Sequence, residues 1–209
     1  RSLWVDARRR LFQNKAAVIS LFLIFLVAFL SFFGPFFLKY SFSDTDWNSI
    51  YYPPSFNNGH FLGTDGNGRD LLVRILYGGR LSLTIGILAT LVSVFIGVIY
   101  GTIAGYFGGK LDIFMMRFVE ILYAMPYLIF VILLMVVFGR NIYFLFIAIG
   151  AVEWLTMARI VRGQTISLKE KEFIETSKAL GQSNFMIIWK HIIPNLAGPI
   201  VVYITLMVP

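Results

Sequence analysis

Long apolar runs, separated by short charged segments, most limit what this sequence can fold into. Residues 16–33 contain no charged side chain. At a rise of about 1.5 Å per residue, a helix over this run just spans a hydrocarbon core of about 30 Å. Similar runs recur along the chain, and only 14% of its residues are charged, against about 25% in soluble domains. The sequence therefore predicts an all-α polytopic membrane protein.

The distribution of basic residues predicts how these spans are oriented. Thirteen of the 18 lysines and arginines fall in three stretches, residues 1–15, 105–117 and 159–191. Because cytoplasmic loops are enriched in Lys and Arg, these stretches, and with them the N-terminus, are expected in the cytoplasm. Membrane orientation also explains the net charge of +7 better than nucleic-acid binding does, since the positive charges are not clustered with exposed aromatic side chains.

The apolar runs and the loops between them define an expected order of elements. That order is a basic cytoplasmic segment at 1–15, a first span at 16–33, an external loop at 34–80, a second span at 81–104, a cytoplasmic loop at 105–117, a third span at 118–138, an external turn at 139–141, a fourth span at 142–158, a cytoplasmic loop at 159–191 and the start of a fifth span at 192–209. Pro126 is expected to kink the third span. Small residues three or four apart on the second span should let another helix approach closely; they are Ser82, Gly86, Ala89, Ser93, Gly97, Gly101 and Ala104.

The charged stretch at 169–194 predicts a helix–turn–helix outside the bilayer. Helical spacing gives its first helix one face on which another protein could dock, formed by Phe173, Ile174, Ser177 and Leu180. Gly181 is expected to end that helix, because glycine adopts a left-handed conformation without strain. Ser183 or Asn184 should cap the second helix, which runs into Pro194 at the start of the fifth span.

The same stretch resembles a known motif. Glu175, Gly181 and the pair Ile193-Pro194 stand at the spacing of the EAA loop of ABC-importer permeases, and the run HIIPN, residues 191–195, is similar to the HILPN variant of the peptide and nickel permease family. Thr176 and Ser177 replace the two alanines usual in that motif, and both remain small. The resemblance implies that this loop seats in a groove of an ATPase subunit. The coupling residues that it implies are Glu175, Thr176, Ser177, Gly181, His191, Ile193 and Pro194.

A second run, LGTDGNGRDLLVRILYGGRLSL at residues 62–83, resembles the LGTDxxGRDxLxRxxxGxRxSL stretch of the C-type permease subunit of peptide importers. The chain is identified as similar to this family over nearly its whole length, with the oligopeptide permeases favoured among its members. The resemblance implies a type I ABC importer permease fold with about five of six expected transmembrane helices present, so a further helix is expected after the end of this chain. It also implies a multi-pass location in the bacterial inner membrane and a place for the external loop where a binding protein docks.

The resemblance implies a non-catalytic subunit that forms half of a translocation path for peptides. Its implied partners are a second homologous permease subunit, two ATP-binding subunits and an extracytoplasmic peptide-binding protein. ATP and Mg would bind the partner ATPases, and the absence of a GxxxxGK[ST] run here fits that division. No catalytic, cofactor or metal site is predicted: the chain has no cysteine, its two histidines are far apart, and GTDGNG lacks the Walker lysine and the dinucleotide spacing.

Two acidic residues lie within apolar runs, where ionisable groups suggest function. Glu120 is one helical turn from Arg117, so an ion pair is the simpler interpretation. Glu153 has no charged neighbour on its own turn; it either lines the translocation path and contacts the amino terminus of a peptide, or bonds to another helix. An alternative function is a proton-coupled secondary transporter with Glu120 and Glu153 as the relay, although it gives no reason for the cytoplasmic helix–turn–helix. A membrane enzyme is disfavoured, because GxSG, HExxH and paired-aspartate motifs are missing.

Overall fold

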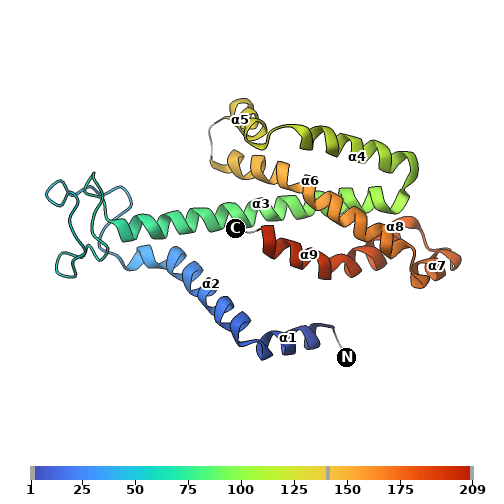
Figure 1. Ribbon diagram of the computed structural model, residues 1–209, viewed down its shortest axis with the longest axis horizontal. Helices are drawn as coiled ribbons and strands as arrows, with labels where there is room; N and C mark the ends of the chain where they lie inside the picture. The colour runs from blue at the N-terminus through green and yellow to red at the C-terminus, as the bar shows by residue number, and fades with distance from the viewer. Residues whose placement is uncertain (1–2, 140–141, 208–209) are drawn as a thin grey trace. The chain divides into compact units, whose positions relative to one another are not determined.

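The computed structural model describes residues 3–139 and 142–207, and this part of the chain contains helices and loops but no strand. The elements are α1 (Leu3–Gln13), α2 (Lys15–Phe33), the short 3₁₀ helix η1 (Gly34–Phe37), α3 (Leu71–Phe107), α4 (Gly109–Ala124), α5 (Tyr127–Phe138), α6 (Ile142–Lys169), α7 (Glu172–Ala179), α8 (Asn184–Ile187), the π-helical η2 (Ile188–Ile192) and α9 (Ile193–Met207) (Figure 1). The chain forms two compact units, residues 1–84 and 85–209.

Among the described residues, three helical segments are long and apolar enough to cross a membrane: Lys15–Phe37, Leu71–Phe107 and Asn184–Leu206. Helices of this length and composition, without strands in the described part of the chain, confirm the predicted all-α membrane protein. The third and fourth predicted spans, 118–138 and 142–158, are not among these three segments and stay predictions.

In the first unit, the end of α2 packs on the beginning of α3 through two glycines. A Cβ atom built on Gly79 would lie 2.6 Å from Oγ of Ser31, and one built on Gly34 would lie 2.8 Å from Cδ1 of Leu76. Both distances are too short for a larger side chain without movement of its neighbour. The close approach of α2 to α3 therefore depends on these glycines.

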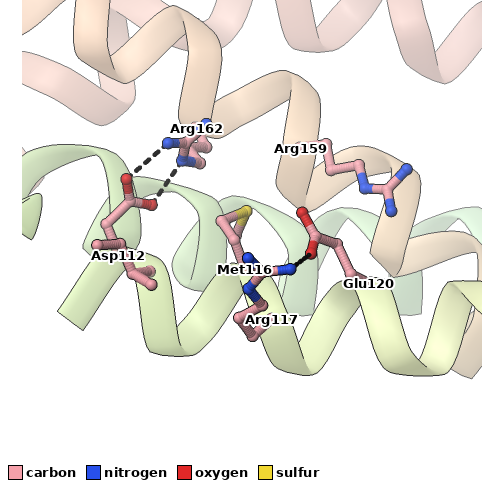
Figure 2. Close-up of a pocket in the computed structure, with 7 residues that line it drawn as sticks. Asp112, Met116, Arg117, Glu120, Arg159 and Arg162 are labelled. Atoms are coloured by element: carbon pink, nitrogen blue, oxygen red, sulfur yellow. Dashed lines mark hydrogen bonds and ion pairs between the residues drawn. The ribbon is translucent and has the colours of Figure 1, made fainter. Parts of the chain in front are cut away.

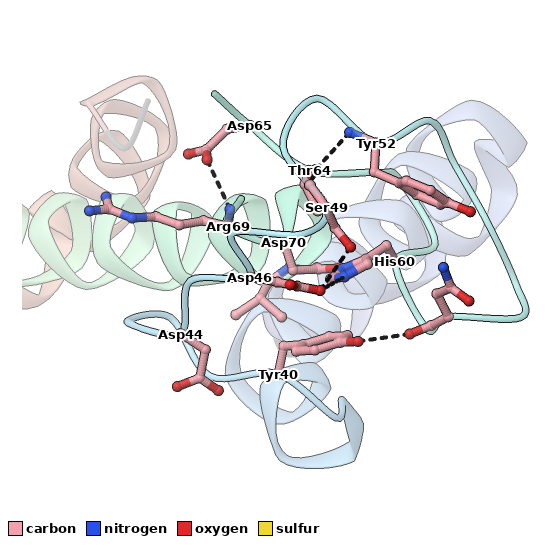
Figure 3. Close-up of polar contacts among 12 residues, drawn as sticks. Tyr40, Asp44, Asp46, Ser49, Tyr52, His60, Thr64, Asp65, Arg69 and Asp70 are labelled. Atoms are coloured by element: carbon pink, nitrogen blue, oxygen red, sulfur yellow. Dashed lines mark hydrogen bonds and ion pairs between the residues drawn. The ribbon is translucent and has the colours of Figure 1, made fainter. Parts of the chain in front are cut away.

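The long loop between η1 and α3 is organised around a buried histidine (Figure 3). His60 is 1% exposed, its Nδ1 lies 3.0 Å from Oδ2 of Asp70, and its ring stacks on Tyr40 with the centroids 4.2 Å apart. Asp70 also accepts a 2.9 Å hydrogen bond from the backbone N–H of Val73 in the first turn of α3. A single carboxylate thus joins the loop to the start of the helix, as N-terminal capping groups do.

A second carboxylate closes the turn before α3. Asp65 accepts hydrogen bonds from the backbone N–H groups of Asn67 and Arg69, and its Oδ2 lies 3.7 Å from Nε of Arg74. These contacts, the bond to Arg69 N–H first, lower the pKa of Asp65. Asp65 thus bonds local backbone groups and lies beside an arginine, whereas Asp70 pairs with His60.

In the second unit, α3 and α6 approach closely along a stripe of glycines. A Cβ atom on Gly97 would lie 2.6 Å from Cβ of Met157, and one on Gly105 would lie 2.8 Å from the carbonyl oxygen of Arg162. Gly101, between them, faces the carbonyl oxygen of Ala158. The predicted packing of the second span through its small residues is confirmed, and the stripe continues one turn further, to Gly105.

Two expected boundaries are wrong. Residues 105–117 were expected to form a loop, but α3 continues to Phe107 and α4 begins at Gly109, because Gly108 and Gly109 take φ values of 65° and 57° and reverse the chain within two residues. The region 34–80 is likewise not all loop, since α3 begins at Leu71. Charged side chains near these helix ends gave the sequence its loop-like appearance. The expected external turn at 139–141 lies mostly outside the described residues.

Pro126 does more than kink the third predicted span. α4 ends at Ala124 and α5 begins at Tyr127, and the two helices point in different directions (Figure 1). Pro126 has no N–H to donate, and proline disfavours a helical conformation in the residue before it, here Met125, which is extended with ψ 135°. The break leaves two helices, each too short to count as a span by itself.

Candidate functional site

The helix–turn–helix predicted at 169–194 is present, and its turn is fixed by backbone hydrogen bonds. Gly181 has a φ of 77°. Its N–H bonds to the carbonyl oxygen of Lys178 at 2.9 Å, and the N–H of Gln182 bonds to that of Ser177 at 3.1 Å. This pair of bonds is the Schellman motif, which satisfies the last carbonyl groups of a helix and requires a left-handed residue at this position. Gly181 ends α7 as predicted.

The second helix starts at the predicted cap but continues beyond the predicted boundary. Oγ of Ser183 accepts a 3.3 Å hydrogen bond from the N–H of Met186. The helix then widens into the π-helical η2, where the N–H of Ile193 bonds to the carbonyl oxygen of Ile188. Pro194 follows directly, and the wider turn lies where the proline cannot donate a helical hydrogen bond. The last part of the predicted cytoplasmic loop and the fifth predicted span therefore form one continuous helix from 184 to 207.

The α7–α8 hairpin, residues 172–187, is anchored on the ends of α3 and α6 (Figure 1). Ile174 and Ile187 are fully buried, in a cluster that also includes Tyr106 of α3. The hydroxyl of Tyr106 donates a 2.8 Å hydrogen bond to Oδ1 of Asn184. At the end of α6, Nζ of Lys169 donates to the carbonyl oxygen of Gly105 at 3.1 Å. These contacts connect the hairpin to two long helices.

His191 ties the hairpin's turn to the start of α9. Its Nε2 lies 3.0 Å from Oε1 of Gln182, and its carbonyl oxygen accepts a 2.6 Å hydrogen bond from the side-chain amide of Asn195. The residue is half-buried. His191 therefore positions the turn from within, instead of presenting its ring outward.

The predicted coupling residues lie on α7, in the turn after it, on η2 and at the start of α9, and only some of them are exposed. Thr176 and Ser177 donate their hydroxyls to carbonyl oxygens four residues earlier in α7, at 2.8 Å each. With its hydroxyl satisfied internally, each behaves as a small residue, which explains how they replace two alanines. The exposed members of the predicted set are Glu175, Thr176, Gly181 and Pro194; Ser177 is buried, and His191 and Ile193 are half-buried.

The predicted docking face is divided between two sides of α7. Ile174 and Ser177 point into the protein, whereas Phe173 is 41% exposed and Leu180 is 75% exposed. The predicted helix is present, but the predicted docking face combined residues that anchor α7 on the protein with residues that α7 exposes to solvent. Large apolar side chains left exposed on and beside the hairpin are Phe173, Leu180, Phe185, Met186 and Trp189.

The two acids within the third and fourth predicted spans, Glu120 and Glu153, differ in their surroundings. Oε2 of Glu120 lies 3.1 Å from Nη1 of Arg117, so the predicted ion pair is confirmed. Within the described part of the chain, Glu153 makes no hydrogen bond or ion pair. It borders a cavity of about 270 Å³ together with Tyr123 and Thr156. The prediction that Glu153 lines a translocation path stays a prediction.

A buried ion pair that the sequence reasoning missed joins α4 to α6 (Figure 2). Nε and Nη2 of Arg162 donate to Oδ1 and Oδ2 of Asp112 at 2.5 and 2.6 Å. The Asp112 carboxylate raises the pKa of Arg162. The two residues are 50 positions apart, and the predicted order of elements places them in two different loops, 105–117 and 159–191. The Gly108-Gly109 turn could have indicated that Asp112 lies in the first turn of a new helix, but not that Arg162 is its partner.

Comparisons with known proteins agree with this architecture. Residues 93–209 match the family model described as a binding-protein-dependent transport system inner membrane component, and residues 2–54 match the N-terminal TM domain of oligopeptide transport permease C. The chain is 54% identical to the oligopeptide transport system permease protein OppC of Haemophilus influenzae and 52% identical to that of Escherichia coli K12, covering 100% of this chain and 67% and 69% of those proteins. It is 44% identical to the dipeptide transport system permease protein DppC of Bacillus subtilis, over 98% of this chain and 63% of that protein.

The long apolar helices and the absence of strands in the described residues define an all-α membrane protein. The chain belongs to the family of inner membrane components of binding-protein-dependent transport systems, the ABC-importer permeases, and is similar to oligopeptide permease C proteins along its full length.

Proposed function

We propose that this chain is the transmembrane permease subunit of an ATP-driven importer for peptides, with oligopeptides as the substrate class. It forms half of the translocation path and lies in the bacterial inner membrane with its N-terminus in the cytoplasm. Relatives named as oligopeptide and dipeptide permeases support the substrate class. The excess of Lys and Arg in residues 1–15 and 159–191 supports the orientation.

The observation that carries the proposal is the α7–α8 hairpin. Its outer residues, including Phe173, Leu180 and Glu175, are exposed, while Ile174 and Ile187 are buried against the long helices. Such an element suits the transfer of a conformational change from a soluble partner to the membrane helices. An ATPase can shift the inward–outward equilibrium only if its ATP-bound and ATP-free forms bind the two states with different affinities. The hairpin is the element through which we expect that difference to act.

The proposal assigns the remaining parts to other chains. Two ATP-binding subunits carry ATP and Mg, a second homologous permease subunit completes the path, and an extracytoplasmic peptide-binding protein delivers the substrate. The subunit described here is then a transport component without its own catalytic residues, cofactor or metal. The exposed apolar side chains on the hairpin support a protein partner there, because soluble surfaces rarely keep such groups uncovered.

Co-purification tests this function. The full-length protein is extracted in mild detergent, and bound subunits are identified by mass spectrometry and an ATPase assay. We expect ATPase subunits to be retained and peptide uptake in cells to require ATP. A chain that purifies without ATPase subunits, combined with uptake that stops when a protonophore is added while ATP is plentiful, would instead support the proton-coupled transporter.

The Glu153→Gln variant tests the translocation path. The substitution removes a negative charge while keeping the shape of the side chain. If Glu153 contacts the amino terminus of a peptide, we expect uptake of free peptides to fall about tenfold or more, since a charge-assisted hydrogen bond contributes about 1.5–3 kcal/mol and about 1.4 kcal/mol is a factor of ten. Uptake of N-acetylated peptides should change little. Equal rates for wild type and variant with every peptide would remove Glu153 from the path.

A further inference from the structure

A polar cavity of about 420 Å³ lies between α4 and α6, apart from the hairpin (Figure 2). Three arginines and two acids border it, which leaves an excess of one positive charge. The lining residues are Asp112, Ile113, Met116, Arg117, Glu120, Arg159 and Arg162. Neither the coupling role nor the path role proposed above uses this cavity.

The charges around the cavity are unequally satisfied. Asp112 binds Arg162 through two hydrogen bonds, and Glu120 pairs with Arg117. Among the described residues, Arg159 makes no ion pair; its guanidinium carbon lies 4.0 Å from the centre of the Tyr123 ring. A cation held at a cavity by an aromatic ring, with its donors uncommitted to an acid, is suited to an anionic ligand, and guanidinium groups match phosphate oxygens in particular.

We propose that this cavity binds the phosphate of an anionic lipid headgroup, with Arg159 as its main cationic contact. Arg117 lies directly before the third predicted span and Arg159 directly after the fourth, which places the cavity at cytoplasmic headgroup depth. This placement rests on the membrane orientation proposed above. Basic pockets between transmembrane helices on the cytoplasmic side are suited to anionic headgroups.

The neighbouring surface of α4 favours a lipid over free phosphate as the source of that group. Phe118 and Ile121 of α4, which follow Arg117 into the third predicted span, are 48% and 66% exposed. These side chains provide an apolar surface for acyl chains directly beside a cationic pocket. A ligand with a charged head and an apolar tail fits the cationic pocket and the apolar surface together, whereas inorganic phosphate uses the cationic pocket alone.

Native mass spectrometry of the full-length protein, with any subunits that co-purify, tests the site. Phosphatidylglycerol, phosphatidylcholine and inorganic phosphate are added separately at equal concentrations. We expect preferential binding of phosphatidylglycerol, and about a fivefold weaker affinity in Arg159→Gln, the effect of about one interfacial charge. The control is Lys110→Gln, which removes the same charge from an exposed position on α4 outside the cavity and should bind as wild type does.

The Glu120→Gln variant adds a test in the opposite direction. It removes the acid that competes for Arg117, at a side chain that is 54% exposed, so phosphatidylglycerol should bind more tightly than to wild type. Inorganic phosphate binding with the same sensitivity to Arg159→Gln would support the site and identify soluble phosphate as its source. Equal binding of phosphatidylglycerol and phosphatidylcholine, or equal losses in Arg159→Gln and Lys110→Gln, would overturn the proposal. None of these measurements needs an ATPase, so a missing ATPase partner would count against the proposed function alone.

Discussion

Peptide uptake is expected to fall at least tenfold in a full-length protein carrying Gly181→Asp, while the protein still folds and inserts. A Cβ atom on Gly181 meets no atom of this chain within 4 Å, so the added side chain creates no internal clash. The backbone φ of 77° disfavours most residues, but Asp tolerates the left-handed region better than most. We therefore expect the loss of uptake to come from weaker binding of the ATPase subunit, because a carboxylate that is buried in a protein interface without a hydrogen-bonding or ion-pairing group is costly. Uptake of labelled peptide and ATPase co-purification measure it.

Gly109→Asp is the matched control for this variant. Gly109 also has a positive φ, 57°, also has open space around its Cβ position, and is predicted on the same side of the membrane, but it lies at the start of α4 outside the hairpin. The Gly109→Asp variant should transport as wild type does.

The charge reversal Glu175→Lys should also uncouple transport from ATP, at a folding cost of only about 0.3–1 kcal/mol from the helix dipole. Normal uptake in both Gly181→Asp and Glu175→Lys would refute the coupling role of the hairpin.

The parts of the fold that local chemistry decides were predictable from sequence. Gly181 ends α7 and Ser183 caps α8 because each satisfies backbone groups within three or four residues of itself. The small-residue stripe of α3 likewise predicted close helix packing, since Gly97 and Gly101 admit a neighbouring backbone that larger side chains would exclude. The length and composition of the apolar runs were sufficient to predict a helical membrane protein, because few backbone structures can satisfy all their hydrogen bonds within lipid.

The parts that depend on contacts between distant segments were not predictable. The face that α7 presents was misjudged because Ile174 and Leu180 are equally apolar in sequence, and only packing against α3 decides which is buried. The loop at 105–117 was predicted too long because charged residues extend to Arg117, whereas the chain reverses within Gly108 and Gly109 alone. The pairing of Asp112 with Arg162 could not be found from sequence, because nothing local to either residue specifies the other.

Breaking the Asp112–Arg162 ion pair is expected to have a large effect on stability. The Asp112 side chain is 12% exposed and that of Arg162 is 34% exposed. Removal of one partner of a buried ion pair lowers the free energy of unfolding by about 3–5 kcal/mol. Because Arg162 is partly exposed, we expect the loss here to lie near or below the lower end of that range. We expect Arg162→Ala to lower the midpoint of thermal unfolding of the detergent-purified protein by roughly 5–10 °C, on the usual 2–4 °C per kcal/mol for a chain of this size.

The two single substitutions should differ, and the double substitution should recover part of the loss. Arg162→Ala leaves a buried carboxylate without its partner, whereas Asp112→Ala leaves an arginine that can reach water. The first is therefore expected to be the more damaging, and Asp112→Ala combined with Arg162→Ala should be less damaging than the sum of the two. Arg117→Ala is the control: it breaks the exposed pair with Glu120, whose side chains are 74% and 54% exposed, and should cost less than about 1 kcal/mol. Equal midpoints for Arg162→Ala and Arg117→Ala would show that the buried pair contributes no more than a surface contact.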